Sequence, residues 1–334
     1  MTRVTKRVRL SPFLLLALFM TEPNRASASC GASSCFLVTG TQEGIQQRGR
    51  ITLDLSYRYI SQDRKRRGTG GADEVLAAEV SFEQGRIDPG DHREIRTVNK
   101  LAQLDLNVGV TERFSLALTI PFLNDRDHEH FDEVGTPDEF FTRQDGTSGF
   151  GDVRLVARLA LVVSARDLLV GGIGAKLPTG EWKLRDSEGD INEPTLMPGT
   201  GSYDAVASIY YDHQWIPDRL DGFLSGSYQA NGQNGLDYDF GDITILNAGV
   251  NWAVTPVVLI SGQLNARITP HDRFLNRLVP NTGATIVNLT PGITLTSPEG
   301  TRYYLHVSVP VYEDVNDAQL TPAFSVTAGL SKTF

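Results

Sequence analysis

The chain has 334 residues, 40% hydrophobic and 21% charged, which is the composition of a folded protein rather than of a disordered one. A mean hydropathy of -0.19 excludes several membrane-spanning helices, each of which needs about 20 consecutive apolar residues. The formal net charge is -9, and residues 1–28 contribute +4 through five Lys and Arg and one Glu, so the remainder carries -13. This acidity argues against a nucleic-acid partner.

The N-terminus has the three parts of a secretory signal peptide. A basic start is followed by the apolar run from Leu10 to Met20 and by the small residues Ala26, Ser27 and Ala28. Eleven helical residues span roughly 16 Å, about half of a bilayer core, so a membrane anchor is the weaker interpretation. We predict that residues 1–28 are a signal peptide and that the protein is exported.

Two cysteines, Cys30 and Cys35, follow the predicted cleavage site. An exported chain meets an oxidising compartment, so they are candidates for a disulfide. Lipidation of Cys30 is the weaker alternative, because Ser27 stands where a large aliphatic residue is expected. A metal site made by two cysteines alone is weaker still.

From about residue 50 the sequence alternates between apolar and polar residues, which predicts strands with one apolar and one polar face. In 113–122, for example, Phe114, Leu116, Leu118, Ile120 and Phe122 lie on one side. We predict twelve such strands, of which those starting at 168, 202 and 221 alternate poorly. The segments are 50–61, 95–110, 113–123, 150–163, 168–177, 202–213, 221–231, 242–254, 257–268, 285–296, 301–312 and 321–334.

The connections between these segments switch between short turns and longer polar loops. The loops are 62–94, 124–149, 178–201, 232–241, 269–284 and 313–320. Short turns at one end and long loops at the other are typical of a transmembrane antiparallel up-and-down β-barrel, with turns in the periplasm and loops outside the cell. The strands of a soluble β-sandwich also alternate between apolar and polar residues. Those strands are shorter, however, and long and short connections need not lie at opposite ends of the sandwich. The sequence therefore predicts an all-β barrel over residues 50–334, preceded by a periplasmic segment over 29–49.

In such a barrel the apolar faces contact lipid and the polar faces line a lumen. Arg154 and Arg158 lie on one inner face, two inward-facing positions apart. They are predicted to form a constriction with lumen carboxylates, so that the selectivity of the pore depends on the size and charge of the solute. The predicted lumen residues are Asp54, Arg58, Asp105, Arg154, Arg158, Asp204, Arg267 and His306.

Aromatic residues near the segment ends, including Tyr57, Phe122 and Trp252, fit interfacial girdles. The final strand ends on Phe334 in the lipid-facing register. A C-terminal aromatic of this kind resembles the signal read by the barrel assembly machinery, which implies the outer membrane of a Gram-negative cell. The expected partners are therefore that machinery, outer-membrane lipid and lipopolysaccharide. The basic run from Arg64 to Arg67 is interpreted as a solvated loop, with lipopolysaccharide contact as the alternative.

Three short motifs carry a family resemblance. Gly149-Phe150-Gly151-Asp152-Val153 opens the fourth strand, Lys176-Leu177-Pro178-Thr179-Gly180 closes the fifth, and Gly199-Thr200-Gly201-Ser202-Tyr203-Asp204 opens the sixth. Their order and spacing resemble the outer-membrane transporter-like barrels grouped with the meta-pathway phenol-degradation proteins. The resemblance implies a channel for small, including aromatic or apolar, compounds, and it identifies no substrate and no binding residues.

No catalytic constellation or cofactor is expected from the residues. His128 and His130 lie in an acidic stretch that is interpreted as a solvated loop, with a divalent metal site as a weak alternative. His306 and Ser308 share one strand face, but that face is predicted to line the lumen, whereas a lipid hydrolase needs its nucleophile toward lipid.

The function predicted from the sequence is passive passage of small solutes across the outer membrane, without enzymatic activity. A non-conducting surface anchor or adhesin is the main alternative, and a lipid hydrolase is the lesser one. Loops 62–94 and 124–149 are the segments expected to plug the pore if it is closed.

Overall fold

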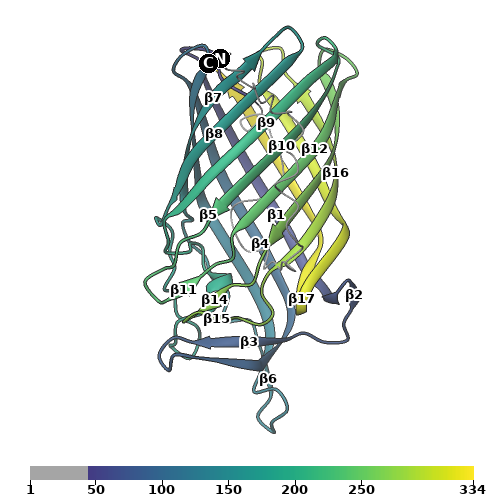
Figure 1. Ribbon diagram of the computed structural model, residues 1–334. Helices are drawn as coiled ribbons and strands as arrows, with labels where there is room; N and C mark the ends of the chain where they lie inside the picture. The colour runs from purple at the N-terminus through teal and green to yellow at the C-terminus, as the bar shows by residue number, and fades with distance from the viewer. Residues whose placement is uncertain (1–43) are drawn as a thin grey trace, which may run out of the picture.

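The computed structural model describes residues 44–334 and forms a closed antiparallel β-barrel (Figure 1). The predicted signal peptide, Cys30 and Cys35 lie outside the described residues. Neighbouring wall strands follow one another along the chain, and β1 pairs with both β4 and β17, which closes the sheet. Eleven strands of the described chain make the wall: β1 (Ile51–Gly68), β4 (Arg86–Gly109), β5 (Phe114–Asp132), β7 (Val153–Val163), β8 (Asp167–Leu177), β9 (Asp204–Ile216), β10 (Leu220–Ala230), β12 (Ile243–Ala253), β13 (Val258–Thr269), β16 (Ala284–Thr296) and β17 (Arg302–Thr333).

Strand β17 has two differently paired halves. Its residues from Arg302 to Val315 pair with β16, whereas those from Val315 to Thr333 pair with β1. Between the halves Asp317 adopts a φ of 45°, a left-handed conformation that suits a tight reversal. The predicted segments 301–312 and 321–334 thus form one strand assignment that reverses near Asp317, within the predicted loop 313–320.

The two faces of the wall are opposite in character, as the alternation predicts. Outward positions are exposed and apolar, as at Leu159 and Leu264, whereas inward positions such as Asn265 and Thr290 are fully buried and polar. Within the described residues, a large share of the buried side chains is polar, which is the reverse of a soluble core. The side chains facing out from the wall would therefore suit hydrocarbon, and the interior would suit water.

Short turns lie at one end of the barrel, the turn end, where Ile51 N donates to the carbonyl of Phe334 at 3.2 Å. The longer connections lie at the opposite end, the loop end (Figure 1). The aromatic residues Tyr57, Phe122, Trp252 and Phe334 are all exposed on the outside, where the girdle interpretation places them.

Three wall strands extend further toward the loop end than the sequence predicts. Strand β1 continues to Gly68, β4 begins at Arg86 and β5 continues to Asp132, so the predicted loops 62–94 and 124–149 are in large part strand. Alternation fails to reveal these extensions because both of their faces are polar. Arg64 and Arg66, for example, both pair with Glu313 of β17, at 3.0 and 2.8 Å.

Smaller elements gather at the loop end (Figure 1). There Tyr238, Phe274, Val279 and Val80 form a small apolar core. No helix within residues 44–334 is long and apolar enough to cross a membrane. The smaller elements are β2 (Gly70–Gly71), β3 (Leu76–Ser81), β6 (Phe140–Thr142), β11 (Tyr238–Asp239), β14 (Arg273–Phe274), β15 (Arg277–Leu278) and the 3₁₀ helix η3 (Pro194–Leu196).

Candidate channel lumen

Charged side chains follow one register row across six neighbouring wall strands. Antiparallel register partners share a face of the sheet, so the whole row points inward. It contains four of the predicted lumen residues and one charged residue that the prediction omits, Lys176. The charged row is Asp54, Asp105, Thr119, Arg154, Lys176 and Asp204, from β1, β4, β5, β7, β8 and β9.

The charged row runs obliquely from the turn end to the loop end of the barrel because the strands are tilted. Asp54 lies three residues from the start of β1, at the turn end, whereas Asp204 is the first residue of β9, at the loop end. Arg158 lies four residues closer to the turn end than Arg154 and interacts electrostatically with Asp105. Positive and negative groups are therefore spread along the length of the lumen rather than collected at one level.

Each acidic member of the charged row has polar partners. Tyr304 donates to Asp54 at 2.6 Å, and Thr119 and Gln103 donate to Asp105 at 2.5 and 2.6 Å. Of the other predicted lumen residues, Arg58 Nε donates to Thr327 Oγ1 at 3.2 Å, and Arg267 is only 2% exposed. The lumen wall is thus a connected polar network.

His306 also faces the lumen and is not paired with Ser308. Its Nε2 lies 3.3 Å from Ser261 Oγ, while Thr290 donates to Ser308 at 2.9 Å. The ring lies over Gly292, where an added Cβ would come within 1.8 Å of it. His306 Nδ1 is buried with no hydrogen-bond partner, so no third group orients the imidazole as a catalytic base requires.

The three sequence motifs meet in one buried cluster at the loop end, which we call the Lys176 cluster. Lys176 Nζ lies 2.7 Å from Asp152 and 3.0 Å from Asp204, and it also donates to Thr200. All three charged side chains are at most 3% exposed. Lys176 escaped the prediction of lumen residues because 168–177 alternates poorly, although it opens the second motif.

The motif glycines allow the chains around the Lys176 cluster to approach closely. A Cβ on Gly180 would lie 2.8 Å from the Cα of Gly199, so neither position has room for a side chain. The amides of Gly180 and Thr200 both donate to Asp152, each at 2.9 Å. Asp152, at the end of the connection between β5 and β7, therefore joins both ends of the connection between β8 and β9.

One connection folds into the lumen, between β8 and β9. Its residues Pro194–Met197, the inserted segment, lie between two cavities of about 100 and 50 Å³. Leu196 and Met197 are each only 5% exposed, and Asn124 donates to the carbonyl of Pro198 at 2.7 Å. The sequence pointed to 62–94 or 124–149 as the segments that could plug the pore; in the structure 178–201 also enters the lumen, and Val75 and Val80 of 62–94 line the first cavity beside it.

Buried polar groups at the loop end form hydrogen bonds around the inserted segment. Tyr238 donates to Asp272 at 2.7 Å, and Asp272 lines the second cavity. Burial disfavours the carboxylate and raises the pKa of Asp272 to about 6.

At the turn end, Ile45 packs against Val170 and Phe223, whose side chains face inward. The lumen is therefore narrowed at both ends.

His128 and His130 are not on a solvated loop, which corrects the interpretation of their surroundings. They belong to β5, face inward and are 2% and 6% exposed. The neighbouring residues Asp125, Asp127 and Glu129 point outward and are charged. Their charge gives this stretch the composition of a solvated loop. These charges also mark where the outer surface ceases to suit hydrocarbon.

Comparison with known proteins identifies the fold of the chain but not its family. No protein-family description and no curated protein matches the sequence. The structure resembles an outer-membrane channel from Pseudomonas putida F1 with a TM-score of 0.63 and 13% identity, over 89% of this chain and 100% of that one. The NanC porin matches at 0.43 and 9% identity, over 84% and 98% of the two chains. The Pseudomonas putida toluene transporter TodX also matches at 0.43 and 10% identity, over 92% and 96%. The first of these similarities shows that the chain shares the β-barrel fold of the Pseudomonas putida F1 protein.

Proposed function

We propose that the protein is a passive outer-membrane channel for small solutes. The observation that carries this proposal is the reversal of polarity, with an apolar outer surface and a polar, charged interior within the described residues. A wall of this kind is stable where hydrocarbon is outside and water is inside. The shared fold of the Pseudomonas putida F1 channel supports the same location.

The barrel crosses the membrane with twelve strand segments in this proposal, because each half of β17 pairs with a different neighbour. An even number places the start of β1 and the end of β17 on the same, periplasmic side. Phe334 then lies exposed at the periplasmic edge, where the assembly machinery would read it. The loop end faces the exterior and its lipopolysaccharide.

The lining of the lumen favours small polar or charged solutes. Both signs of charge occur along the charged row, and the inserted segment divides the space at the loop end. A narrow bore with fixed charges selects by size and by charge. Apolar or aromatic solutes, which the family resemblance implies, would meet a mostly polar wall, so they are tested as a separate arm.

Reconstitution tests this function against the anchor or adhesin alternative. Protein that migrates as a folded barrel on unboiled gels is inserted into planar bilayers and into liposomes that are then exposed to external sugars of increasing size. We expect discrete conductance steps and uptake limited to the smallest solutes. Folded protein that gives neither conductance nor uptake would be an anchor, and the channel proposal would fail.

Removal of Arg158 should change the ion selectivity of the channel. Arg158→Ala deletes an inward cation opposite Asp105, so the reversal potential in a salt gradient should shift toward cation preference. Arg113→Ala, at an exposed turn, is the matched control and should leave the potential unchanged. Equal potentials for Arg158→Ala and the unmodified protein would remove Arg158 from the conduction path.

A further inference from the structure

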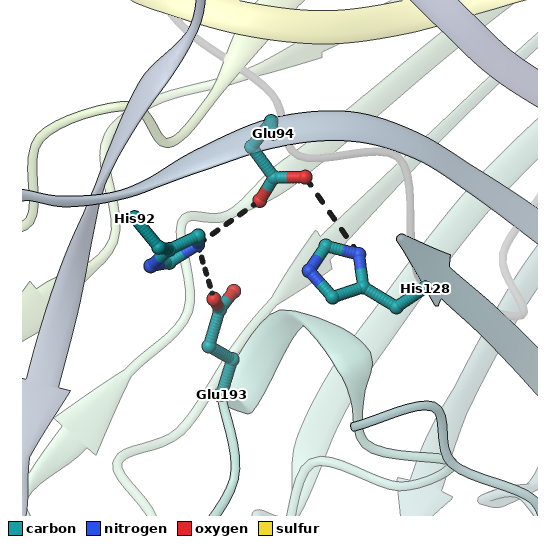
Figure 2. Close-up of side chains that lie close together, drawn as sticks. All are labelled: His92, Glu94, His128 and Glu193. Carbon is teal, nitrogen blue, oxygen red and sulfur yellow. Dashed lines mark hydrogen bonds and ion pairs between the residues drawn. The ribbon is translucent and has the colours of Figure 1, made fainter. Parts of the chain in front are cut away.

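Histidines and carboxylates from three parts of the chain converge inside the loop end of the barrel (Figure 2). His92 and Glu94 are two residues apart on β4, and His128 and His130 are two apart on β5, so each pair shares one face. The register pairs Glu94 with His130 and Thr97 with His128, which brings the two inward faces together. Glu193 completes the group from the connection between β8 and β9.

The distances within this group are those of a compact ligand set. His92 Nε2 lies 2.8 Å from Glu193 Oε1 and 3.2 Å from Glu94 Oε1. Glu94 Oε2 lies 3.7 Å from His128 Nδ1. One ligand atom from each of the four residues lies within 4.8 Å of the other three. Tetrahedral ligands at 2.0 to 2.1 Å from an ion are separated by about 3.3 Å, so small side-chain rotations would close the set.

The group holds more buried polar atoms than its own contacts satisfy. Glu94 Oε2, His128 Nε2 and His130 Nδ1 are all buried with no hydrogen-bond partner. The His128 side chain is only 1% exposed and is aimed into the group (Figure 2). A buried polar atom without a partner is unfavourable, so several together favour a ligand at this place.

Charge alone explains part of the arrangement. Burial disfavours charge on both partners, but the attraction between them raises the pKa of the His92 imidazole and lowers the pKa of the Glu193 carboxyl. An ion pair of this kind satisfies His92 and Glu193 and leaves the unpartnered atoms of Glu94 and His128 unexplained. A cation bound between all four residues would engage Glu94 together with the imidazoles.

We propose that His92, Glu94, His128 and Glu193 bind one divalent transition-metal ion of the zinc class. Two imidazole nitrogens and two carboxylate oxygens are a donor set that suits Zn²⁺, whereas Ca²⁺ and Mg²⁺ prefer oxygen ligands alone. His130, which contacts Asp132 at 2.9 Å, lies beside the site with its ring centre 4.6 Å from that of His128. His130 would help to position the ligands rather than bind the ion itself.

The metal site would tie the inserted segment to the wall. Glu193 directly precedes Pro194, and the other three ligands are on β4 and β5. An ion held by all four residues fixes the inserted segment across the lumen. This tethering rests on the proposed channel function, whereas metal binding does not.

The test uses the full mature chain without a histidine tag, folded in detergent and stripped with a chelator. Zn²⁺ is titrated against a competing chelating dye, and Co²⁺ is titrated with its visible absorption as the readout. We expect one tight site per chain, and we expect His128→Asn and Glu193→Gln each to weaken it by about 100-fold or more. Heat-modifiable migration on gels confirms that each variant is folded.

His213→Asn is the matched control, because His213 pairs with the carboxylate of Asp167 at 2.8 Å near the turn end. It should bind Zn²⁺ as the unmodified chain does. Binding of Zn²⁺ by Glu193→Gln and His128→Asn with unchanged affinity, or no binding by the unmodified chain, would overturn the site.

The tethering is tested separately by conductance with Zn²⁺ and after chelation. We expect Zn²⁺ to lower the conductance of the unmodified protein and to leave that of Glu193→Gln unchanged. Zn²⁺ that binds without changing conductance would overturn the tethering and leave the metal site standing. An absence of conductance under both conditions would instead contradict the proposed channel.

Discussion

Replacement of the inserted segment Pro194–Met197 by Gly-Ser-Gly-Ser should raise the single-channel conductance by roughly twofold or more, because conductance grows with the open cross-section. Leu196 and Met197 are buried between the two cavities, and glycine and serine remove the apolar contacts that hold them there. The chain length stays the same, so the neighbouring strands need not move. Planar-bilayer recordings measure the effect directly, and the size limit for sugar uptake should rise with it.

The matched control replaces Glu133–Thr136 with the same four residues. That stretch forms a turn beyond the end of β5 and lines neither of the two cavities beside the inserted segment, so its replacement should not alter conductance. If the variant of the inserted segment conducts like the unmodified protein, this segment does not limit the pore.

Lys176→Met should destabilise the barrel by about 3–5 kcal/mol, the usual cost of removing one partner of a buried ion pair. The substitution leaves Asp152 and Asp204 facing each other with no cation between them. The measurement is the temperature at which the protein loses its folded migration on a gel, and it should fall sharply.

Lys100→Met provides the contrast for Lys176→Met. Lys100 pairs with Asp127 on the outer surface, where the two side chains are 33% and 59% exposed, and such pairs contribute at most about 1 kcal/mol. Its melting temperature should change little. Adding Asp152→Asn and Asp204→Asn to Lys176→Met should restore part of the lost stability, because no buried charge then remains unpaired. Equal melting temperatures for the two single variants would show that the Lys176 cluster is not a stabilising ion-pair site.

The alternation of residues revealed the wall of the barrel because one face of each strand has to be apolar. Leu116, Leu118 and Ile120 therefore fall on the predicted outer side, and Asp105 and Arg267 fall on the predicted inner side. The same signal fails beyond the apolar band. His128 and Arg66 lie on loop-end extensions of β5 and β1 whose two faces are both polar, and such extensions have the composition of a loop.

The candidate sites depend on contacts between residues far apart in the sequence. Lys176 meets Asp152 and Asp204, which are each more than 20 residues away, and no periodicity encodes that meeting. The short motifs contain these residues, but the family resemblance drawn from them identified no site and did not include Lys176 among the lumen residues. Glu193 had no signal of its own, because its role depends on which connection folds into the lumen.

The account depends most on the contact of the outward rows with hydrocarbon. The most direct measurement is a nitroxide scan of Ile260 to Arg267 on β13 in lipid vesicles, one labelled cysteine at a time, with Cys30→Ser and Cys35→Ser. We predict that collision with dissolved oxygen is high at Ile260, Gly262 and Leu264 and low at Ser261, Gln263 and Asn265, alternating with a period of two. Labels at Ile260 and Leu264 that are immobilised and shielded from oxygen would place those side chains in a protein core and contradict a membrane-spanning barrel.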